Sequence, residues 1–324
     1  MMNNQLAPIL LIGFNRPRHF QKTIIALSKN DLAKKSDLYI SIDGPINDID
    51  FNAQKLILKS INDLKDSFRS VIIFNQKENL GLAKNITTSI SKVLTDNKKI
   101  IVVEDDIVTS KNFLRYMNDA LSFYSDHKKI WHISGHNIYN DLQRKDEIFL
   151  WRFMDCWGWG TWKDRWQNFE NSPRKLIENF SNNDIYKFNL DGNRNSWNQV
   201  EQNSLGYINT WAIFWYATIF KNNGLCVSPW WSFVRNIGHD GSGTHTKVNI
   251  YKNNNHTLNN EGIFKGKYEF KEDKRAFEIM KIAYRPKRHI TSVISDALLK
   301  VFNKEIHDVI KKYYYLIKHS KKKK

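Results

Sequence analysis

The chain has 324 residues, of which 41% are hydrophobic and 26% charged, values that exclude a disordered or fibrous protein and indicate a globular one. Its two cysteines, Cys156 and Cys226, are too few for a disulfide framework or a cysteine-rich zinc site, which is typical of a reducing compartment. The N-terminus has no signal-like apolar stretch and no run is long enough to span a bilayer, so we expect a cytoplasmic protein.

The formal net charge of +17 implies an anionic partner or surface. No zinc-finger, RNA-recognition or helix-turn-helix pattern accompanies the charge, so nucleic acid is not an expected partner. Much of the excess lies late in the chain and ends in Lys321–Lys324. An anionic membrane attracts such segments by about 1 kcal/mol per basic residue, which predicts peripheral attachment to the cytosolic face of an inner membrane. The alternative is a solvated tail.

The first part of the chain alternates predicted strands with predicted helices. Short β-branched runs bounded by turn residues are typical of buried strands, and apolar residues at helical spacing indicate amphipathic helices. Such alternation forms right-handed βαβ units, so we expect an α/β, Rossmann-like fold with a mostly parallel sheet flanked by helices. The predicted strands are residues 8–14, 37–42, 70–74 and 100–103, and the predicted helices are residues 19–28, 51–64, 82–94 and 112–124.

Polar residues follow the first three of these strands, where ligands bind in open parallel sheets. Asn15 and Arg16 follow the first strand, and Arg16 has the chemistry to meet a diphosphate or a base; the alternative is a helix N-terminal turn before Pro17. Asp43 ends the second strand, either in a simple turn or hydrogen-bonded to a nucleoside. Asn79 and Lys84 flank a glycine-led helix start that favours anions, although many turns look alike.

Three consecutive carboxylates, Glu104, Asp105 and Asp106, follow the fourth predicted strand. Adjacent carboxylates at the end of a buried strand repel one another and lose hydration. A Mg²⁺ or Mn²⁺ ion would relieve both costs, because these ions prefer oxygen ligands and use one or two carboxylates together with substrate phosphates. The alternative is an acidic loop or a cap for the next helix. Because polar residues follow all four predicted strands, we favour a phosphorylated substrate that binds through a metal ion.

The segment 151–166 combines several tryptophans with glycine and aspartate. Aromatic faces with polar edges suit sugars, and from this segment we expect Trp159 at a donor sugar and Asp155 at sugar hydroxyls. For the tryptophans the alternative is an aromatic core beneath a loop, and for Asp155 it is a surface ion pair with a nearby arginine such as Arg152.

A glycine-rich loop over residues 236–246 contains His239, Asp240 and His245. An imidazole such as that of His245 has the chemistry to complete a metal shell, and Asp240 the chemistry of a general base toward a hydroxyl group. The alternative is polar turn material. Beyond it, residues 251–324 are expected to form a linker and a helical, basic C-terminal region.

Several segments resemble a known family. The run IIVVEDDIVTSKNFLRYM resembles the donor-site segment of N-acetylglucosaminyltransferase I and of the bacterial sugar transferases related to it. Five further segments resemble the bacterial members of this family: YISIDGP, ENLGLAKN, WGWGTWKDRW, WAIFWYA and NIGHDGSGTHT. The resemblance covers about residues 8–246. It implies a GT-A glycosyltransferase domain at residues 1–250 and an inverting, nucleotide-sugar-dependent activity.

The resemblance also implies site roles. Asp106 would contact the Mn²⁺ or Mg²⁺ ion, while Glu104 and Asp105 would face the donor sugar and ribose. Arg16 and Asp43 would hold the nucleotide. The metal would neutralise the departing diphosphate.

The chain departs from the family at the general base. Many relatives carry aspartate inside a Trp-Asp-x-x-Trp motif, whereas this chain has Ala212, which cannot accept a proton. A base from elsewhere is therefore required, with Asp240 as the first choice and Asp155 as the second.

These observations predict a hexosyl- or N-acetylhexosaminyl-transferase that extends a surface polysaccharide or lipid-linked glycan, such as lipopolysaccharide or capsule. One alternative is a nucleotidyltransferase-like or other nucleotide-binding α/β enzyme, although residues 14–17 lack the glycine-rich phosphate loop that such an enzyme needs. Another is a non-catalytic protein that binds nucleic acid or glycan, which the net charge and Ala212 favour.

Overall fold

The computed structural model describes residues 5–241 and 257–285. All described helices and strands belong to one compact unit, Met1–Tyr284. The predicted metal ligand His245 and the basic tail lie outside the described residues, and so does the predicted domain boundary at residue 250. The division into domains and the membrane-associated tail therefore stay predictions.

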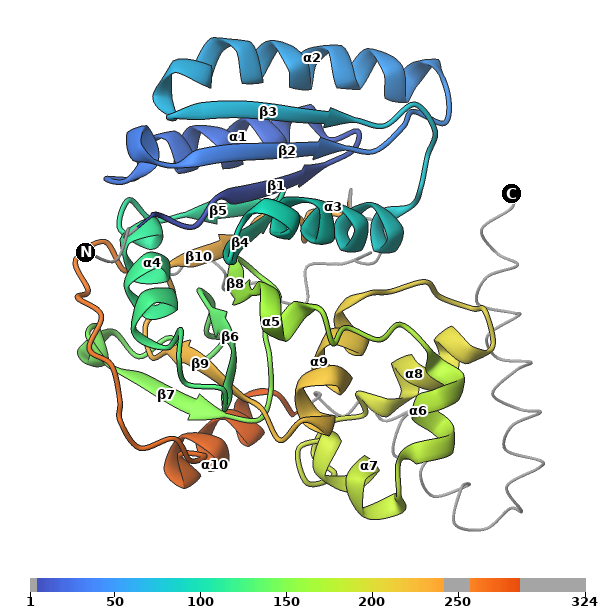
Figure 1. Ribbon diagram of the computed structural model, residues 1–324, viewed down its shortest axis with the longest axis vertical. Coiled ribbons are helices and arrows are strands. Elements are labelled where there is room, and N and C mark those ends of the chain that lie inside the picture. Colours follow the sequence, from blue (N-terminus) through green and yellow to red (C-terminus); the bar gives the residue numbers. More distant parts are fainter. Residues whose placement is uncertain (1–4, 242–256, 286–324) are drawn as a thin grey trace. The chain divides into compact units, whose positions relative to one another are not determined.

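An eight-stranded sheet in the order β3-β2-β1-β4-β8-β6-β9-β7 organises the unit (Figure 1). Its pairings make six strands run in one direction, while β8 and β7 run in the other. The strands are β1 (Ile9–Gly13), β2 (Asp37–Ile42), β3 (Ser70–Asn75), β4 (Lys99–Glu104), β6 (Ile130–Ser134), β7 (Ile148–Trp151), β8 (Trp159–Trp162) and β9 (Leu225–Pro229). A two-stranded antiparallel sheet pairs β5 (Ile107–Thr109) with β10 (Val234–Asn236).

Both faces of the large sheet are buried, because alternate residues of its central strands enter two separate hydrophobic cores. Leu10 and Val102 belong to one core, Leu11 and Val103 to the other. The Leu11 face is covered by α1 (Pro17–Ser28), α2 (Asp48–Leu64) and α4 (Phe113–Phe123). The Leu10 face is covered by α3 (Leu82–Asp96), α5 (Lys163–Trp166), α9 (Ala212–Lys221) and α10 (Lys274–Ala283).

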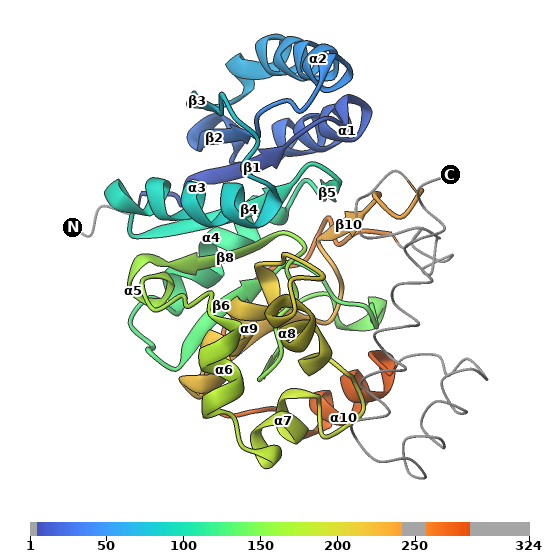
Figure 2. The same cartoon turned by 90° about the vertical axis from the view of Figure 1, so that its right-hand side faces the viewer.

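Three further α-helices, α6 (Pro173–Asn179), α7 (Asn182–Phe188) and α8 (Trp197–Ser204), lie beside α9 in both views (Figures 1 and 2). Short 3₁₀-helices occur at η1 (Ala33–Lys35), η2 (Lys65–Ser67) and η3 (Leu142–Arg144). The α/β prediction, with a mostly parallel sheet flanked by helices, is confirmed. In the described part of the chain, no helix has both the length and the apolar character to cross a bilayer.

Candidate functional site

The candidate site lies at the edge where the parallel strands end. Trp159 at the start of β8 pairs with Val102 of β4 on one side and with Ser134 of β6 on the other. Two residues further along, Glu104 ends β4 and His136 follows β6, so both reach the same edge. Because neighbouring strands lie about 4.8 Å apart, the backbones of β4 and β6, on either side of β8, are separated by roughly 10 Å.

Arg16, which follows β1, binds the acidic cluster at this edge. The acidic cluster is the run Glu104, Asp105 and Asp106. The Arg16 guanidinium donates to a carboxylate oxygen of Asp105 and, at 2.9 Å, to Asp106 Oδ2. The hydroxyl of Thr23 on α1 donates to the Asp105 carbonyl at 2.7 Å. Helix α1 and the residue that precedes it thus supply both the counter-charge of the cluster and a backbone anchor.

The loop that follows β10 closes on the same cluster. The amide of Ile237 donates to the Asp106 carbonyl at 2.8 Å. Gly238 lies so close that an added Cβ would be 2.1 Å from Asp106 Oδ2 and 3.0 Å from Arg16 Nη1. The Asp106 side chain is therefore confined between Arg16 and this loop.

The cluster places three carboxyl groups near one guanidinium. Burial raises the pKa of Glu104 to about 8, and the charges of Asp106 and Asp105 add to this effect. Burial also raises the pKa of Asp105, which Arg16 opposes. A site that penalises its own charges in this way favours an additional cation.

Three other residues predicted to bind the donor, Asp43, Asn79 and Lys84, lie at the end of β2 and at the start of α3. Asp43 is buried and accepts hydrogen bonds from the amides of Gly44 at 3.0 Å and Leu80 at 2.8 Å, so it ties the end of β2 to the start of α3. Asn79 in this loop donates to the Gly44 carbonyl at 2.7 Å. Lys84 is exposed on the first turn of α3.

Asn15 follows β1, and its amide donates to Asp50 on α2 at 2.7 Å. Like Arg16, Asn15 therefore lies at the ligand-binding edge of the sheet. Its side chain, however, is hydrogen-bonded to Asp50 of α2 and not to the acidic cluster. Contacts between these residues and a donor stay predictions.

Trp159 lies in the core and not at a ligand site. Its side chain has no exposed surface and stacks between His132, with ring centroids 5.1 Å apart, and Trp211, 5.4 Å apart. This corrects the prediction that Trp159 contacts the donor sugar. The physical reason is that β8 inserts between β4 and β6, which places its first side chain beneath α9 in the aromatic core.

Asp155 forms a largely buried pair with His136, a residue that the sequence pattern does not single out. Oδ2 of Asp155 lies 2.9 Å from His136 Nδ1 and accepts from the Tyr284 hydroxyl at 2.7 Å. The amide of Trp157 donates to Oδ1 at 3.1 Å. The signal that could have found His136 is its place just after a buried apolar strand, the same signal that marks Glu104.

The pair lines a cavity of about 200 Å³, which we call the aromatic cavity. Its walls combine aromatic rings with polar side chains, and they include Ala212 at the start of α9. The remaining lining residues are Ile138, Phe153, Met154, Cys156, Trp157, Arg194, Ser196, Gln199, Ile213, Tyr216 and Tyr284.

Asp240 lies beside the first turn of α1, the helix that begins just after Arg16. Its half-exposed carboxylate pairs with His19 Nε2 at 3.0 Å, so it belongs to the surroundings of α1. The preceding residue, His239, packs on Trp157 of the cavity wall, with ring centroids 5.3 Å apart. Burial lowers the pKa of His239, the Asp106 charge raises it and His136 lowers it, which shows that both groups are near.

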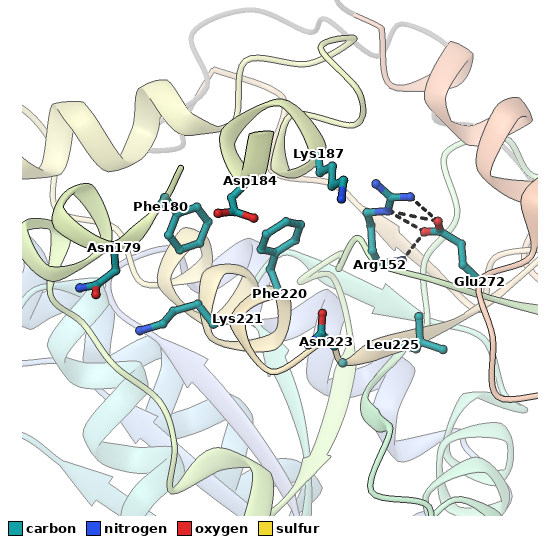
Figure 3. A pocket seen from close by; sticks show the side chains of 11 residues that line it. Arg152, Asn179, Phe180, Asp184, Lys187, Phe220, Lys221, Asn223, Leu225 and Glu272 are labelled. Atoms are coloured by element: carbon teal, nitrogen blue, oxygen red, sulfur yellow. Dashed lines mark hydrogen bonds and ion pairs between the residues drawn. The ribbon is translucent and has the colours of Figure 1, made fainter. Parts of the chain in front are cut away.

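A larger cavity of about 650 Å³ lies at the opposite edge of the sheet (Figure 3). Leu225, the first residue of β9, lines it, and Arg152 there donates to Glu272 at 2.9 Å from Nε. Figure 3 shows this pair at one end, with Phe180, Phe220 and Lys221 further along the wall. None of the predicted site residues that the structure describes lines this cavity.

Among the described residues, no three His, Cys, Asp or Glu side chains converge as a complete metal site. A site of that kind is not required for Mg²⁺ or Mn²⁺ bound with a phosphorylated ligand, because one or two carboxylates suffice when substrate oxygens and water fill the other positions. The confined carboxylate of Asp106, in a cluster where burial disfavours the ionised form of its neighbours, fits this type of ion.

Comparison with known proteins gives no sequence relative. No protein-family profile matches the chain, and no curated protein matches it. Among solved structures, mannosyltransferase PcManGT from Pyrobaculum calidifontis, in complex with GDP-Man and Mn²⁺, is similar at 7% identity and a TM-score of 0.38, over 67% of this chain and 71% of that one.

Two further structures show a similar degree of likeness. Glucosyl-3-phosphoglycerate synthase from Mycobacterium tuberculosis, with Mn²⁺, UDP and glucosyl-3-phosphoglycerate, matches at 10% identity and a TM-score of 0.33, over 50% of this chain and 58% of that one. An active-site mutant of LgtC matches at 11% identity and a TM-score of 0.35, over 66% and 70% of the two chains. These similarities are too loose to assign a function, which rests on the site itself.

Proposed function

We propose that the chain is a metal-dependent, inverting glycosyltransferase that moves a sugar from a nucleotide-sugar donor to a glycan acceptor. The observation that supports this proposal most strongly is the acidic cluster at the ligand-binding edge of the sheet, partly neutralised by Arg16 and confined by Gly238. A nucleoside diphosphate with its metal ion brings both the cation and the phosphate oxygens that such a site favours.

The donor would bind along the ends of β1, β2 and β4. Asp106 would hold a Mn²⁺ or Mg²⁺ ion together with diphosphate oxygens and water, and Glu104 and Asp105 would face the sugar and ribose. Arg16 lies within hydrogen-bond reach of the cluster, so its guanidinium would move from Asp106 toward the diphosphate once the metal charge is present. When bound, the metal would stabilise the charge that develops on the departing diphosphate.

The transfer itself requires an acceptor hydroxyl opposite the leaving group. Its oxygen attacks the anomeric carbon, the bond to the diphosphate oxygen breaks and the hydroxyl proton passes to a base. The aromatic cavity is near enough to receive the acceptor, since its wall residue Cys156 lies close to the cluster. Burial raises the pKa of that thiol, and the charges of Glu104 and Asp106 raise it further.

For the acceptor we propose a cell-surface polysaccharide or a lipid-linked glycan, and for the transferred group a hexose or N-acetylhexosamine. The support is the sequence resemblance to bacterial sugar transferases and the net charge of +17, which suits the anionic membrane on which such acceptors lie.

Donor binding by an Asp106→Ala variant tests the proposal. We expect Mn²⁺ together with UDP or GDP to raise the melting temperature of the native protein, by the equivalent of about 2.7 kcal/mol at a hundredfold excess over Kd. Asp106→Ala should lose this shift, whereas Asp146→Ala, which removes a carboxylate bonded to Lys265 on the surface, should keep it.

A labelled oligonucleotide distinguishes the nucleic-acid alternative. Removal of a repelling carboxylate would leave oligonucleotide binding intact or stronger. A native protein that binds the oligonucleotide but shows no shift with Mn²⁺ and either nucleotide would refute the proposed function.

A further inference from the structure

One histidine lies within β6 and another just after it, and their surroundings differ. His132 is fully buried, and both ring nitrogens are engaged: Nδ1 accepts from Trp215 Nε1 at 3.2 Å and Nε2 donates to the Asp155 carbonyl at 2.9 Å. His136 lines the aromatic cavity, and in the described part of the chain only Nδ1 of its two ring nitrogens has a hydrogen-bond partner. His132 is therefore structural, whereas His136 presents a ring nitrogen for chemistry.

Asp155 fixes the tautomer of His136. Burial opposes the charge of Asp155, but His136 and the Tyr284 hydroxyl overcome it and hold the pKa of Asp155 at about 2. An ionised carboxylate only accepts hydrogen bonds, so His136 donates from Nδ1, and the neutral tautomer that this contact selects carries its lone pair on Nε2. This is the arrangement in which a histidine accepts a proton.

Asp155 itself is poorly suited to accept the proton. Its oxygens already accept from His136, Tyr284 and Trp157. A carboxyl group with so low a pKa is a weak base. The hydroxyl proton of an acceptor therefore has a better destination at Nε2 of His136, because Asp155 already holds the proton on Nδ1.

Packed side chains connect the Asp155–His136 pair with the surroundings of the acidic cluster. His136 packs on Trp157 with ring centroids 4.4 Å apart, and Trp157 packs on His239 at 5.3 Å. Burial raises the pKa of Cys156, and the charges of Glu104, Asp155 and Asp106 raise it further, so that side chain lies near both the cluster and the pair. Ala212, on the cavity wall, cannot accept a proton.

We propose that Nε2 of His136 is the general base of the transfer and that Asp155 is a positioning residue that orients it. The inference rests on the proposed glycosyltransferase activity and names the proton acceptor at that site. The acceptor sugar lies against Trp157, whose ring suits its apolar face, with Arg194 available to its hydroxyls.

The step balances without an additional reactant. The acceptor oxygen forms the new bond to the anomeric carbon, and the electron pair of the broken bond goes to the diphosphate oxygen. The hydroxyl proton moves to His136 Nε2, and the positive charge of the ring is stabilised by Asp155 at 2.9 Å from Nδ1. Release of the proton to water restores the neutral ring.

Variants of the full chain test the base. His136→Asn keeps a side-chain N–H donor but removes Nε2, and His136→Ala removes the ring. With the nucleotide sugar that the native protein turns over best, we expect both to lower kcat by about 10²- to 10⁴-fold, the usual contribution of a general base. The affinity for Mn²⁺ with the matching nucleoside diphosphate should change less than about twofold, since the donor side is untouched. Added imidazole should restore part of the kcat of His136→Ala.

Asp155→Asn tests positioning. It should lower kcat with little change in donor KM, because an amide no longer enforces the tautomer, and imidazole should not restore it, because the His136 ring still fills the site. His127→Gln and Asp146→Asn, which make the same kinds of change outside the cavity, should retain native kcat.

The outcomes separate the two proposals. A native protein that turns over a donor, with a His136→Asn variant of equal kcat or a His136→Ala variant that imidazole does not restore, would overturn the role of His136 and leave the glycosyltransferase intact. A native protein that turns over no donor would overturn both.

Discussion

Arg16 shows how single residues define the donor side. Its guanidinium contacts two carboxylates that follow a different strand, and the carbonyl of one of them is held by Thr23 on α1, the helix that begins just after Arg16. Because the backbone of Asp106 is also held by Ile237, the carboxylate has little freedom to move. The position of Asp106 therefore depends on the absence of a side chain at Gly238.

Gly238→Ala tests this dependence. The new Cβ would lie 2.1 Å from Asp106 Oδ2, so the carboxylate must shift. We expect the affinity for Mn²⁺ with UDP or GDP to fall by about 10- to 100-fold, as when a residue that orients a metal ligand is changed. Isothermal titration measures this loss.

Gly206→Ala is the matched control for that variant. Gly206 has a φ of 72° and no atom within 4 Å of an added Cβ, so alanine there strains the backbone without touching the site. It should cost about 1 kcal/mol of stability and leave nucleotide affinity unchanged. Equal affinities in the native protein and Gly238→Ala would contradict the account of Asp106.

At the scale of elements, the sequence predicts the first four strands of the sheet well. Strands such as Ile9–Gly13 and Lys99–Glu104 are apolar on both faces, and polar residues stand where they end. Local patterning therefore suffices for them. Because parallel strands end at one edge, the same patterning is enough to bring Arg16 and the acidic cluster together there.

The element β8 could not be predicted in the same way. Its four residues, Trp159–Trp162, combine tryptophans with glycine, and nothing local distinguishes a sugar platform from a strand. Its place depends on pairing with β4 and β6, which are distant in sequence. That pairing buries Trp159 and brings Asp155 beside His136, so the prediction for the tryptophan is wrong and local patterning does not reveal the histidine.

At the scale of the whole molecule, the sheet brings together segments that are far apart in the chain. Five separate connections supply Arg16, the acidic cluster, His136, Asp155 and Gly238. The packing beneath them includes His132, which anchors the backbone of Asp155 to the aromatic core. The stability of the fold and the geometry of the site are therefore linked through this residue.

The pH dependence of unfolding tests the buried, neutral state of His132. Burial lowers its pKa to about 4, whereas an unfolded histidine titrates near about 6.5. Between these values the unfolded chain binds more protons, so the free energy of unfolding falls as the pH drops, by up to about 3 kcal/mol from this residue. Urea denaturation at pH values across this window measures the slope.

His132→Gln should be less stable at neutral pH but should lose less stability on acidification. His127→Gln, at the turn before β6, serves as the control and should keep the native slope. The same slope in His132→Gln and in the native protein would show that His132 is not held neutral.

The most direct measurement of the central claim is the release of nucleoside diphosphate from a panel of nucleotide sugars by the full chain, with anionic vesicles that carry glycolipid acceptors. We expect turnover of at least one donor with Mn²⁺, loss of turnover with a chelator and loss of turnover in Asp106→Ala. Absence of turnover across the panel, or turnover that neither the chelator nor Asp106→Ala reduces, would contradict the claim.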